Sequence, residues 1–242
     1  MNTGSEVVLQ LKNVCITYKM QNQLFSKKKL LPIDSLVNIS LKLHKTDRLG
    51  VIGRNGAGKS TLMKVLSGIV SPDKGRMVKL AGVSVQLLSL GVGMEGSLTG
   101  RENAILNGML LGKSRKYMLE KVEKIKDFSE LGHFFEYPVN SYSSGMVARL
   151  GFSVALEVSP DVLLIDEVLG VGDVNFYHKS YNALQKLFDS GKAFVLISHQ
   201  AHTIQELCTQ AIWLEKGRVI MEGSANEVCA QYALGALKKV TI

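Results

Sequence analysis

The chain has 242 residues, of which 46% are hydrophobic and 21% are charged. This composition is typical of a globular protein that can bury a core, in one large domain or two small ones. The sequence has no uncharged apolar run of bilayer-spanning length, and its N-terminus does not resemble a secretory signal. We therefore expect the protein to stay in the cytoplasm. The net charge of +8 leaves nucleic acid, anionic lipid and plain solvent open as surroundings.

The first part of the chain contains one clear strand signal. The stretch Met20–Asp34 is the least periodic and carries Lys27-Lys28-Lys29, so we expect a loop or a small excursion there. Within this stretch the lysines are interpreted as a solvated loop or, alternatively, as a segment close to anionic lipid headgroups. The apolar run Leu49–Ile52 predicts a strand buried on both faces of a sheet.

A glycine-rich loop separates this strand from a helical pattern at Thr61–Ile69. In such a loop, backbone N–H groups and a helix N-terminus converge on one anion. We expect Lys59 to reach the β- and γ-phosphates of a nucleotide and the Ser60 hydroxyl to ligate Mg²⁺. A chance match is the alternative, and the strand before and the helix after disfavour it. The candidate ATP-binding residues here are Gly53, Arg54, Asn55, Gly56, Ala57, Gly58, Lys59, Ser60 and Thr61.

The middle of the chain has a different, helical character. Apolar residues recur every three or four positions between Met118 and Phe134, with Lys and Glu between them. This pattern predicts an amphipathic helix or a helix pair. We therefore place a mostly helical region at 91–158, inserted into a sheet domain formed by 1–90 and 159–242.

The last third returns to strand signals. The runs Val162–Ile165 and Phe194–Ile197 predict further buried strands, and helical patterns between them indicate βαβ units. Segments Ala211–Leu214 and Val219–Met221 are typical of a hairpin, and Ser224-Ala225-Asn226-Glu227 is a capping box that opens a final helix.

Two acidic residues, Asp166 and Glu167, end the strand at Val162–Ile165. An acidic strand end alone is often only solvated charge. Beside a phosphate-binding loop, however, Asp166 can hold Mg²⁺ and Glu167 can polarise the attacking water. Both are therefore candidate site residues, Asp166 for the metal and Glu167 for catalysis.

A Ser-Ser-Gly turn precedes the helical pattern at Val147–Glu157. The motif Tyr142-Ser143-Ser144-Gly145-Met146 resembles the signature motif of ABC-type ATPases. Ser143 precedes Asp166 by 23 residues and Lys59 precedes it by 107, and both separations resemble those of ABC nucleotide-binding subunits. The resemblance extends over nearly the whole chain.

The resemblance implies a fold, a mechanism and an assembly. The fold would be the α/β phosphate-loop ABC ATPase fold, with a mostly parallel sheet core, an N-terminal antiparallel β part and an inserted helical subdomain. Ser143, Ser144 and Gly145 would face ATP held by the loop of a second copy, in a head-to-tail homodimer. His199 would contact the γ-phosphate, Asp173 would lie in the dimer-contacting loop, and Tyr18 would stack on adenine, although a plain strand tyrosine is the alternative.

Three further stretches resemble the branch of the family that exports O-antigens, capsular glycans and teichoic acids. They are Arg149–Ser153 after the signature motif, Val168–Asp173, and Leu90–Gly93 together with Leu98–Asn103. This resemblance implies an ATP-hydrolysing subunit that binds a membrane permease at the cytoplasmic face of the inner membrane. It implies neither a sugar-binding domain in this chain nor a nucleic-acid partner.

One position departs from the family pattern. Most ABC subunits carry a glutamine that touches Mg²⁺ and the membrane partner, but here Ser89 or Leu90 stands near that position and Gln86 lies a few residues early. The metal contact is therefore missing or is supplied differently. Other functions remain open: an ABC subunit for another lipid or a drug, or a soluble ABC ATPase acting on nucleic acid or the ribosome.

Overall fold

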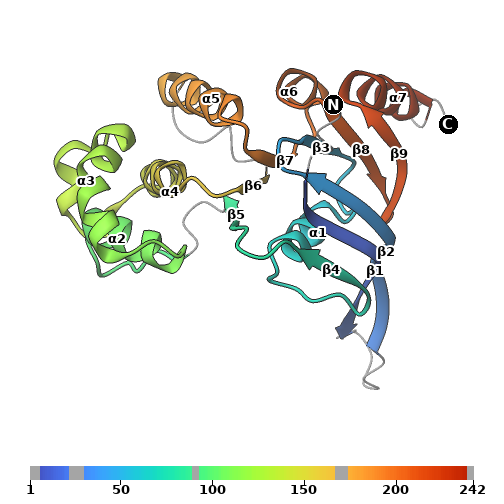
Figure 1. Cartoon of the computed structure of the whole chain (residues 1–242), viewed down its shortest axis with the longest axis horizontal. Coiled ribbons are helices and arrows are strands. Elements are labelled where there is room, and N and C mark those ends of the chain that lie inside the picture. The colour runs from blue at the N-terminus through green and yellow to red at the C-terminus, as the bar shows by residue number, and fades with distance from the viewer. Residues whose placement is uncertain (1–5, 22–29, 89–92, 167–173, 239–242) are drawn as a thin grey trace.

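The computed structural model describes residues 6–21, 30–88, 93–166 and 174–238 (Figure 1). Its strands are β1 (Val7–Gln21), β2 (Leu30–His44), β3 (Arg48–Ile52), β4 (Lys74–Lys79), β5 (Val85–Leu88), β6 (Val162–Asp166), β7 (Ala193–Ile197), β8 (Gln210–Glu215) and β9 (Arg218–Ser224). Its α-helices are α1 (Lys59–Leu66), α2 (Gly100–Leu110), α3 (Arg115–Ser129), α4 (Ser144–Val158), α5 (Val174–Asp189), α6 (Ala201–Leu207) and α7 (Ala225–Lys238). Two short 3₁₀ helices, η1 (Gly132–Glu136) and η2 (Val139–Ser141), precede α4.

A six-stranded sheet forms the centre of the larger lobe. Its order is β5-β6-β7-β3-β8-β9, with parallel pairs throughout except for the antiparallel β8–β9 hairpin. Strand β7 is buried along its whole length, as expected for a strand covered on both faces. The strands and the hairpin predicted from the apolar runs are confirmed, and the Ser224–Glu227 capping box is formed at the start of α7.

A second sheet of order β2-β1-β4 is antiparallel and covers one side of the first (Figure 1). The prediction of a loop over Met20–Asp34 was wrong where the structure describes it, because Met20 pairs with Leu31 and Gln21 with Leu30. Register shifts interrupt this pairing, and both Asn13 and Asn38 have positive φ. These irregularities stop at Thr17, and the pairing beyond it is regular. The strands there were missed because neighbouring residues such as Pro32, Ile33 and Asp34 are all exposed, so neither face of the hairpin end requires an alternation of apolar and polar residues. The segment Lys27–Lys29 lies outside the described residues.

Helices α2, α3 and α4 form a smaller lobe beside the sheets (Figure 1). The predicted amphipathic pattern forms α3, which buries Met118, Val122 and Ile125, and is followed by η1. Arg101 of α2 ties the lobe together by ion pairs to Glu123, at 2.6 Å, and Glu136, at 2.8 Å. Arg101 and then Lys126 lower the pKa of Glu136 to about 2. The division of the chain at residues 91 and 158 stays a prediction.

Three hydrophobic clusters hold these layers together. One lies between the two sheets and α1, the second lies between the parallel sheet and the helices packed on its other face, and the third fills the helical lobe. In the described part of the chain, no helix is both long and apolar enough to cross a bilayer.

Candidate functional site

Three parallel strands deliver candidate residues to one edge of the central sheet. Ile197 at the end of β7 pairs with Val51 of β3 on one side and with Asp166 of β6 on the other. The glycine-rich loop starts at Gly53, two residues after Val51. His199 follows Ile197 by two residues, at the end of the neighbouring strand. The sheet thus brings Gly53, Asp166 and His199 to the same edge, and His199 is exposed there.

The glycine-rich loop surrounds a small polar cavity at the N-terminus of α1. The cavity has a volume of about 360 Å³ and is lined by Ser35, Asn55, Gly56, Gly58, Lys59, Ser60, Thr61 and Asp166. The Lys59 ammonium folds back over the loop and donates to the carbonyl oxygens of Gly53, at 2.8 Å, and Arg54, at 3.2 Å. Arg54 is exposed, whereas Ala57 is buried and anchors the loop through its carbonyl, which accepts from Gly217 at 2.9 Å.

Gly58 sets the shape of this loop. Its φ of 105° lies in the left-handed region, and a Cβ at this position would stand 2.4 Å from the Ser35 carbonyl oxygen. As the residue preceding α1 it also provides no side-chain cap. The first N–H groups of α1 are therefore without a capping side chain, at the end of the helix that attracts anions.

Ser35 is a lining residue that sequence reasoning missed. Its hydroxyl donates to the Thr61 hydroxyl at 2.7 Å, which connects β2 to the first turn of α1. Nothing in the local sequence marks Ser35, since it lies on a different sheet, 26 residues before Thr61. Only the packing of the antiparallel sheet over α1 brings the two hydroxyls together.

Tyr18 lies on the antiparallel sheet and is exposed. It pairs with Ile33 and stands two residues beyond the buried Ile16, so both side chains share the face of β1 that covers the core. Tyr18 is thus at the outer end of the face that packs over α1. It does not line the polar cavity at the glycine-rich loop.

The Ser-Ser-Gly turn begins α4 on the helical lobe, as predicted. The Ser143 hydroxyl caps this helix by accepting from the Met146 N–H at 3.2 Å, and Ser143 and Ser144 are both exposed. None of Ser143, Ser144 and Gly145 lines the cavity at the glycine-rich loop. Within one chain, the structure therefore keeps the two predicted phosphate-binding ends apart.

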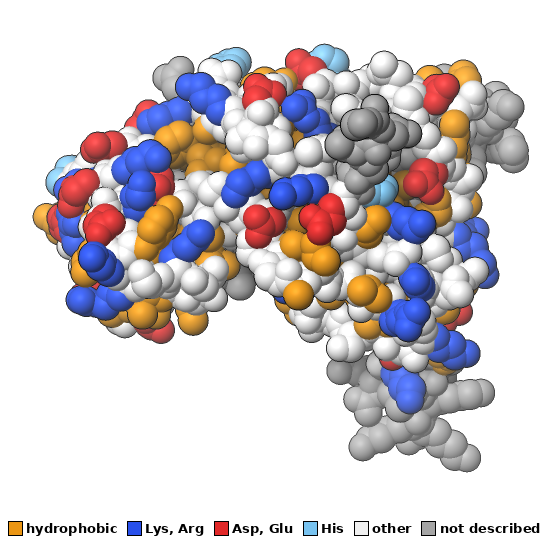
Figure 2. Space-filling view, viewed as in Figure 1, with side chains coloured by type: hydrophobic (Ala, Val, Ile, Leu, Met, Phe, Trp, Pro, Cys, Tyr) orange, Lys and Arg blue, Asp and Glu red, His pale blue; other side chains and the backbone are white. Residues whose placement is uncertain are grey.

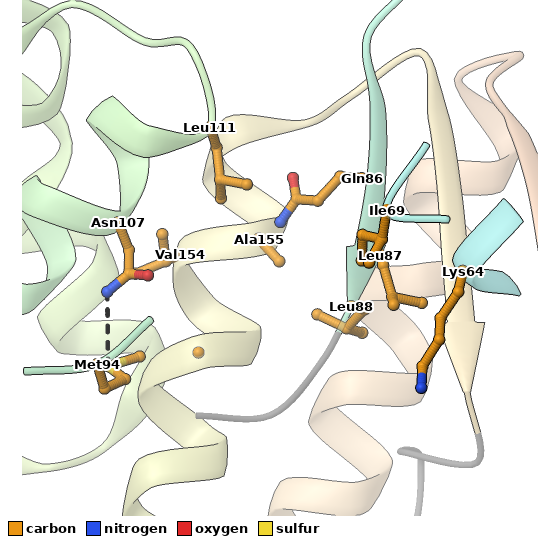
Figure 3. A pocket seen from close by; sticks show the side chains of 11 residues that line it. Lys64, Ile69, Gln86, Leu87, Leu88, Met94, Asn107, Leu111, Val154 and Ala155 are labelled. Atoms are coloured by element: carbon orange, nitrogen blue, oxygen red, sulfur yellow. Dashed lines mark hydrogen bonds between the residues drawn. The ribbon is translucent and has the colours of Figure 1, made fainter. Parts of the chain in front are cut away.

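A second cavity, of about 320 Å³, opens between the two lobes (Figure 3). Its walls are mainly apolar and include Ile69 after α1, Leu111 after α2 and Val154 of α4. The Gln86 amide points into it from β5 (Figure 3). Gln86 is only 7% exposed, and its Oε1 atom has no hydrogen-bond partner among the residues that the structure describes.

Gln86 lies too early in β5 to reach the edge of the sheet at which Asp166 lies. It pairs with Leu163, three residues before Asp166 on β6, which corresponds to about 10 Å along the strand. At the end of β5, Leu88 pairs with Ile165, one residue before Asp166. Ser89 and Leu90 lie outside the described residues. Glu167 and Asp173 also lie outside them.

Comparison with known proteins decides the family. Residues 36–170 match the model of the ABC transporter family. The chain is 40% identical to an O-antigen export system ATP-binding protein RfbB of Klebsiella pneumoniae, over 92% of this chain and 89% of that protein. It is 38% identical to a teichoic acids export ATP-binding protein TagH of Bacillus cereus, over 93% of this chain and 42% of that one.

The chain belongs to the ABC transporter family. A solved structure of the ATP-binding cassette MJ0796, dimeric and bound to ADP and Pi, shares its fold with a TM-score of 0.74 at 23% identity, covering 90% of this chain and 98% of that one. The predicted family and the predicted ABC ATPase fold are confirmed. The chain spans 64% and 46% of the length of two other relatives that it matches at 42% identity.

The loop cavity of this ABC family member fits the ligands that the family implies, ATP and Mg²⁺. A backbone cradle that a single Cβ at Gly58 would obstruct, with a lysine above it, suits phosphate oxygens. The Ser60 hydroxyl and the Asp166 carboxylate line the same cavity and are the hard oxygen ligands that Mg²⁺ prefers.

Proposed function

We propose that this chain is the ATP-hydrolysing motor subunit of a membrane transporter that exports a cell-surface glycan of the O-antigen, capsule or teichoic acid type. The observation that carries the proposal is the cavity at α1, where Lys59, Ser60 and Asp166 converge. The export functions in the names of the RfbB and TagH relatives favour a glycan over another lipid or a drug as cargo.

A small set of residues carries out the chemistry at this cavity, each with its own role. The loop Gly53–Ser60 and Thr61 hold the ATP phosphates, and Lys59 exchanges its contacts with the Gly53 and Arg54 carbonyls for phosphate oxygens. Held by Ser60 and Asp166, Mg²⁺ would neutralise charge that develops on the phosphates. Glu167 accepts a proton from the attacking water, His199 contacts the γ-phosphate, and Tyr18 stacks on adenine.

Two copies of the chain complete the site. The N-terminus of α4, with Ser143, Ser144 and Gly145, is remote from the loop cavity of its own chain and exposed to a partner. A head-to-tail homodimer places it over ATP held by the second copy, with Asp173 in the contact between copies. Closure of the dimer then depends on a γ-phosphate that both chains contact. Hydrolysis cleaves this phosphate from ATP and so removes the shared contact.

The apolar cavity of Figure 3 is the proposed contact with the permease. The lining residues Ile69 and Leu111 are 65% and 37% exposed, and Leu110, next to Leu111 in sequence, is 68% exposed. Exposed apolar side chains that gather at one place mark protein–protein contact sites. The unpaired Gln86 Oε1 requires a hydrogen-bond donor from whatever fills the cavity. An apolar segment of a permease that carries one donor meets both requirements. The subunit is then peripheral, at the cytoplasmic face of the inner membrane.

Replacing Lys59 tests the central claim. Lys59→Ala should lower ATP affinity and turnover by at least about a hundredfold, because the removed cation contacts the phosphates in the ground state and stabilises them more strongly in the transition state, where negative charge develops. Isothermal titration with ATP and phosphate release measure the two effects. Unchanged turnover, in a variant that melts at the parental temperature, would overturn the proposal. Loss of surface glycan with accumulation of its precursor after gene deletion tests the cargo.

A charge placed in the apolar cavity tests the permease contact. Leu111→Glu should reduce co-purification of the permease by at least about tenfold, because a carboxylate would be buried without a partner. ATP hydrolysis by the isolated subunit should stay at the parental rate. Leu119→Glu is the matched control, since Leu119 is an exposed leucine of α3 that does not line the cavity. Equal co-purification of both variants would place the permease elsewhere.

A further inference from the structure

One face of the antiparallel sheet carries basic side chains that the proposed ATPase chemistry does not use. We define the basic face as Lys12 of β1, Lys42 of β2, and Lys74 and Arg76 of β4, all of which are exposed. Strand register brings these side chains together. Gln10 of β1 pairs with Lys42 of β2 on one side and with Val78 of β4 on the other. Two residues further along β1, Lys12 pairs with Arg76 of β4. The alternate residue Leu11 pairs with Leu41 and Met77, which point into the core.

The cations of the basic face lack acidic partners. Within the described part of the chain, no acidic side chain lies within ion-pair distance of any of the four. The helical lobe is different, since Lys121 and Lys124 both pair with Glu157, at 3.3 and 2.7 Å. Two acids beside these strands, Asp34 of β2 and Asp73 directly before β4, both accept hydrogen bonds from Thr17, towards the hairpin end of β1.

This arrangement costs stability in the isolated chain. Like charges that stand opposite each other on neighbouring strands, as Lys12 and Arg76 do, repel one another. An anionic partner would remove the repulsion and gain the attraction of all four cations. Figure 2 shows Lys and Arg side chains gathered along the surface over β1 and β2. An exposed apolar residue, Val78, lies among them at 44% exposure.

The position of the basic face indicates which anion it meets. Ile69 lines the cavity at which we place the permease, and Lys74 begins β4 only five residues later. Five residues span at most about 17 Å, so a permease segment in the cavity brings the β4 edge of the sheet close to the membrane. Edge strand β4 also lies on the side of the antiparallel sheet nearer to β5 (Figure 1).

We propose that the basic face binds the anionic headgroups of the membrane in which the permease is embedded. The inference rests on the proposed function, because the permease contact supplies the orientation. A bilayer surface suits an open sheet face whose charged side chains point the same way, and a nearby apolar residue can enter the headgroup layer. Single-stranded nucleic acid is disfavoured, because the basic face has no aromatic side chain on which bases could stack, and Tyr18 lies on the opposite face of β1.

Vesicle sedimentation with the purified full chain, without permease or ATP, tests this proposal. The probes are phosphatidylcholine vesicles with and without about one third phosphatidylglycerol. The chain should bind only the anionic vesicles, and raising the salt from about 0.05 M to about 0.5 M should release it, because salt shortens the reach of surface charges. Each basic residue contributes about fivefold to partitioning, the equivalent of about 1 kcal/mol. The variant K12Q/K42Q/K74Q/R76Q should therefore bind on the order of several hundredfold more weakly.

A second variant controls for net charge. R115Q/K116Q/K186Q/R218Q removes four exposed cations elsewhere and reaches the same net charge, so it should keep its binding within about threefold. Equal loss in both variants, or equal binding to uncharged vesicles, would overturn the proposal. Loss of duplex RNA binding with unchanged vesicle binding would assign the basic face to nucleic acid instead.

The outcome is separable from that of the proposed function. Both quadruple variants should hydrolyse ATP at the parental rate, and Lys59→Ala should bind anionic vesicles like the parent. Absent vesicle binding with intact ATPase activity rejects the lipid contact alone. Inactive parental protein with normal vesicle binding rejects the ATPase assignment alone.

Discussion

Two helix N-termini in this chain, those of α1 and α4, are both predicted to bind phosphate, and the structure prepares them differently. At α1 the preceding residue is Gly58, which offers no side chain, and the glycine-rich loop curls around the first turn. At α4 the preceding residue is Ser143, whose own hydroxyl accepts the Met146 N–H. One helix end is open within its own chain, and the other is closed by its own cap.

This difference indicates the order in which the two helix ends bind a shared nucleotide. The α1 end can take phosphate without breaking a side-chain bond, apart from the contacts of Lys59 with the loop carbonyls. The α4 end must redirect the Ser143 hydroxyl or use its remaining N–H groups. We therefore expect α1 to bind ATP first and the α4 end of a second copy to add to it afterwards.

The largest expected difference between the two helix ends follows from replacing the glycine at each of them. Gly58→Ala forces a Cβ into the left-handed region and against the Ser35 carbonyl, at 2.4 Å. It should lower the free energy of unfolding by about 2 kcal/mol or more, and ATP affinity by more than about tenfold. Chemical denaturation and ATP titration measure both effects.

Gly145→Ala is the matched control for that experiment. A Cβ at Gly145 would have Ser143 Oγ, at 3.8 Å, as its nearest neighbour, which is an ordinary contact. The variant should keep the parental stability and ATP affinity, and any loss should appear only in hydrolysis by the dimer. If the two glycine variants are equally destabilised, the two helix ends do not differ as described.

Replacing Ser143, the N-cap residue of α4, should have an effect of intermediate size. Ser143→Ala should cost about 1 kcal/mol of unfolding free energy, because one N–H of the first turn loses its acceptor. Ser143→Asp should restore that stability, because Asp caps as well as Ser, yet abolish hydrolysis by placing a carboxylate where phosphate must lie. Full activity of Ser143→Asp would exclude this helix end from the composite site.

The smallest expected effect concerns the hydroxyl pair beside α1. Ser35→Ala removes the donor to Thr61 and should cost about 1 kcal/mol or less, since Ser35 is only partly buried. ATP affinity should fall by a fewfold at most, because Ser35 supports the first turn of α1 through Thr61. Ser40→Ala is the control, since Ser40 lies on the same strand as Ser35, away from α1, and its hydroxyl forms hydrogen bonds with Asn13. This variant should lower stability in thermal denaturation by a similar amount but leave ATP affinity unchanged in titration.

Much of the candidate site was predictable because it consists of short contiguous segments. The loop Gly53–Ser60 and the acid Asp166 each follow an apolar strand, and parallel strands always end at one edge of their sheet. The roles of Glu167 and Asp173, which lie outside the described residues, stay predictions. Ser35 could not be predicted, because its neighbour Thr61 is brought to it by sheet packing and not by any local pattern.

The antiparallel sheet shows where prediction from sequence failed. Strands β1 and β2 extend into Met20–Asp34, where the apolar alternation is lost. The gathering of Lys12, Lys42 and Arg76 on one face depends on the register of three strands that are distant in sequence, so it could not be inferred from the net charge of +8 alone.

By itself, the sequence determined the chemistry of the loop, the parallel strands that present it and the family to which the chain belongs. These depend on residues close together in the chain, whose backbone requirements are local. Only the tertiary structure decided that the Ser143 helix end lies away from its own loop cavity, that Gln86 faces an apolar cleft, and that the unpaired cations share a face. These depend on how distant segments pack, and packing is decided by the burial of whole surfaces rather than by any single motif.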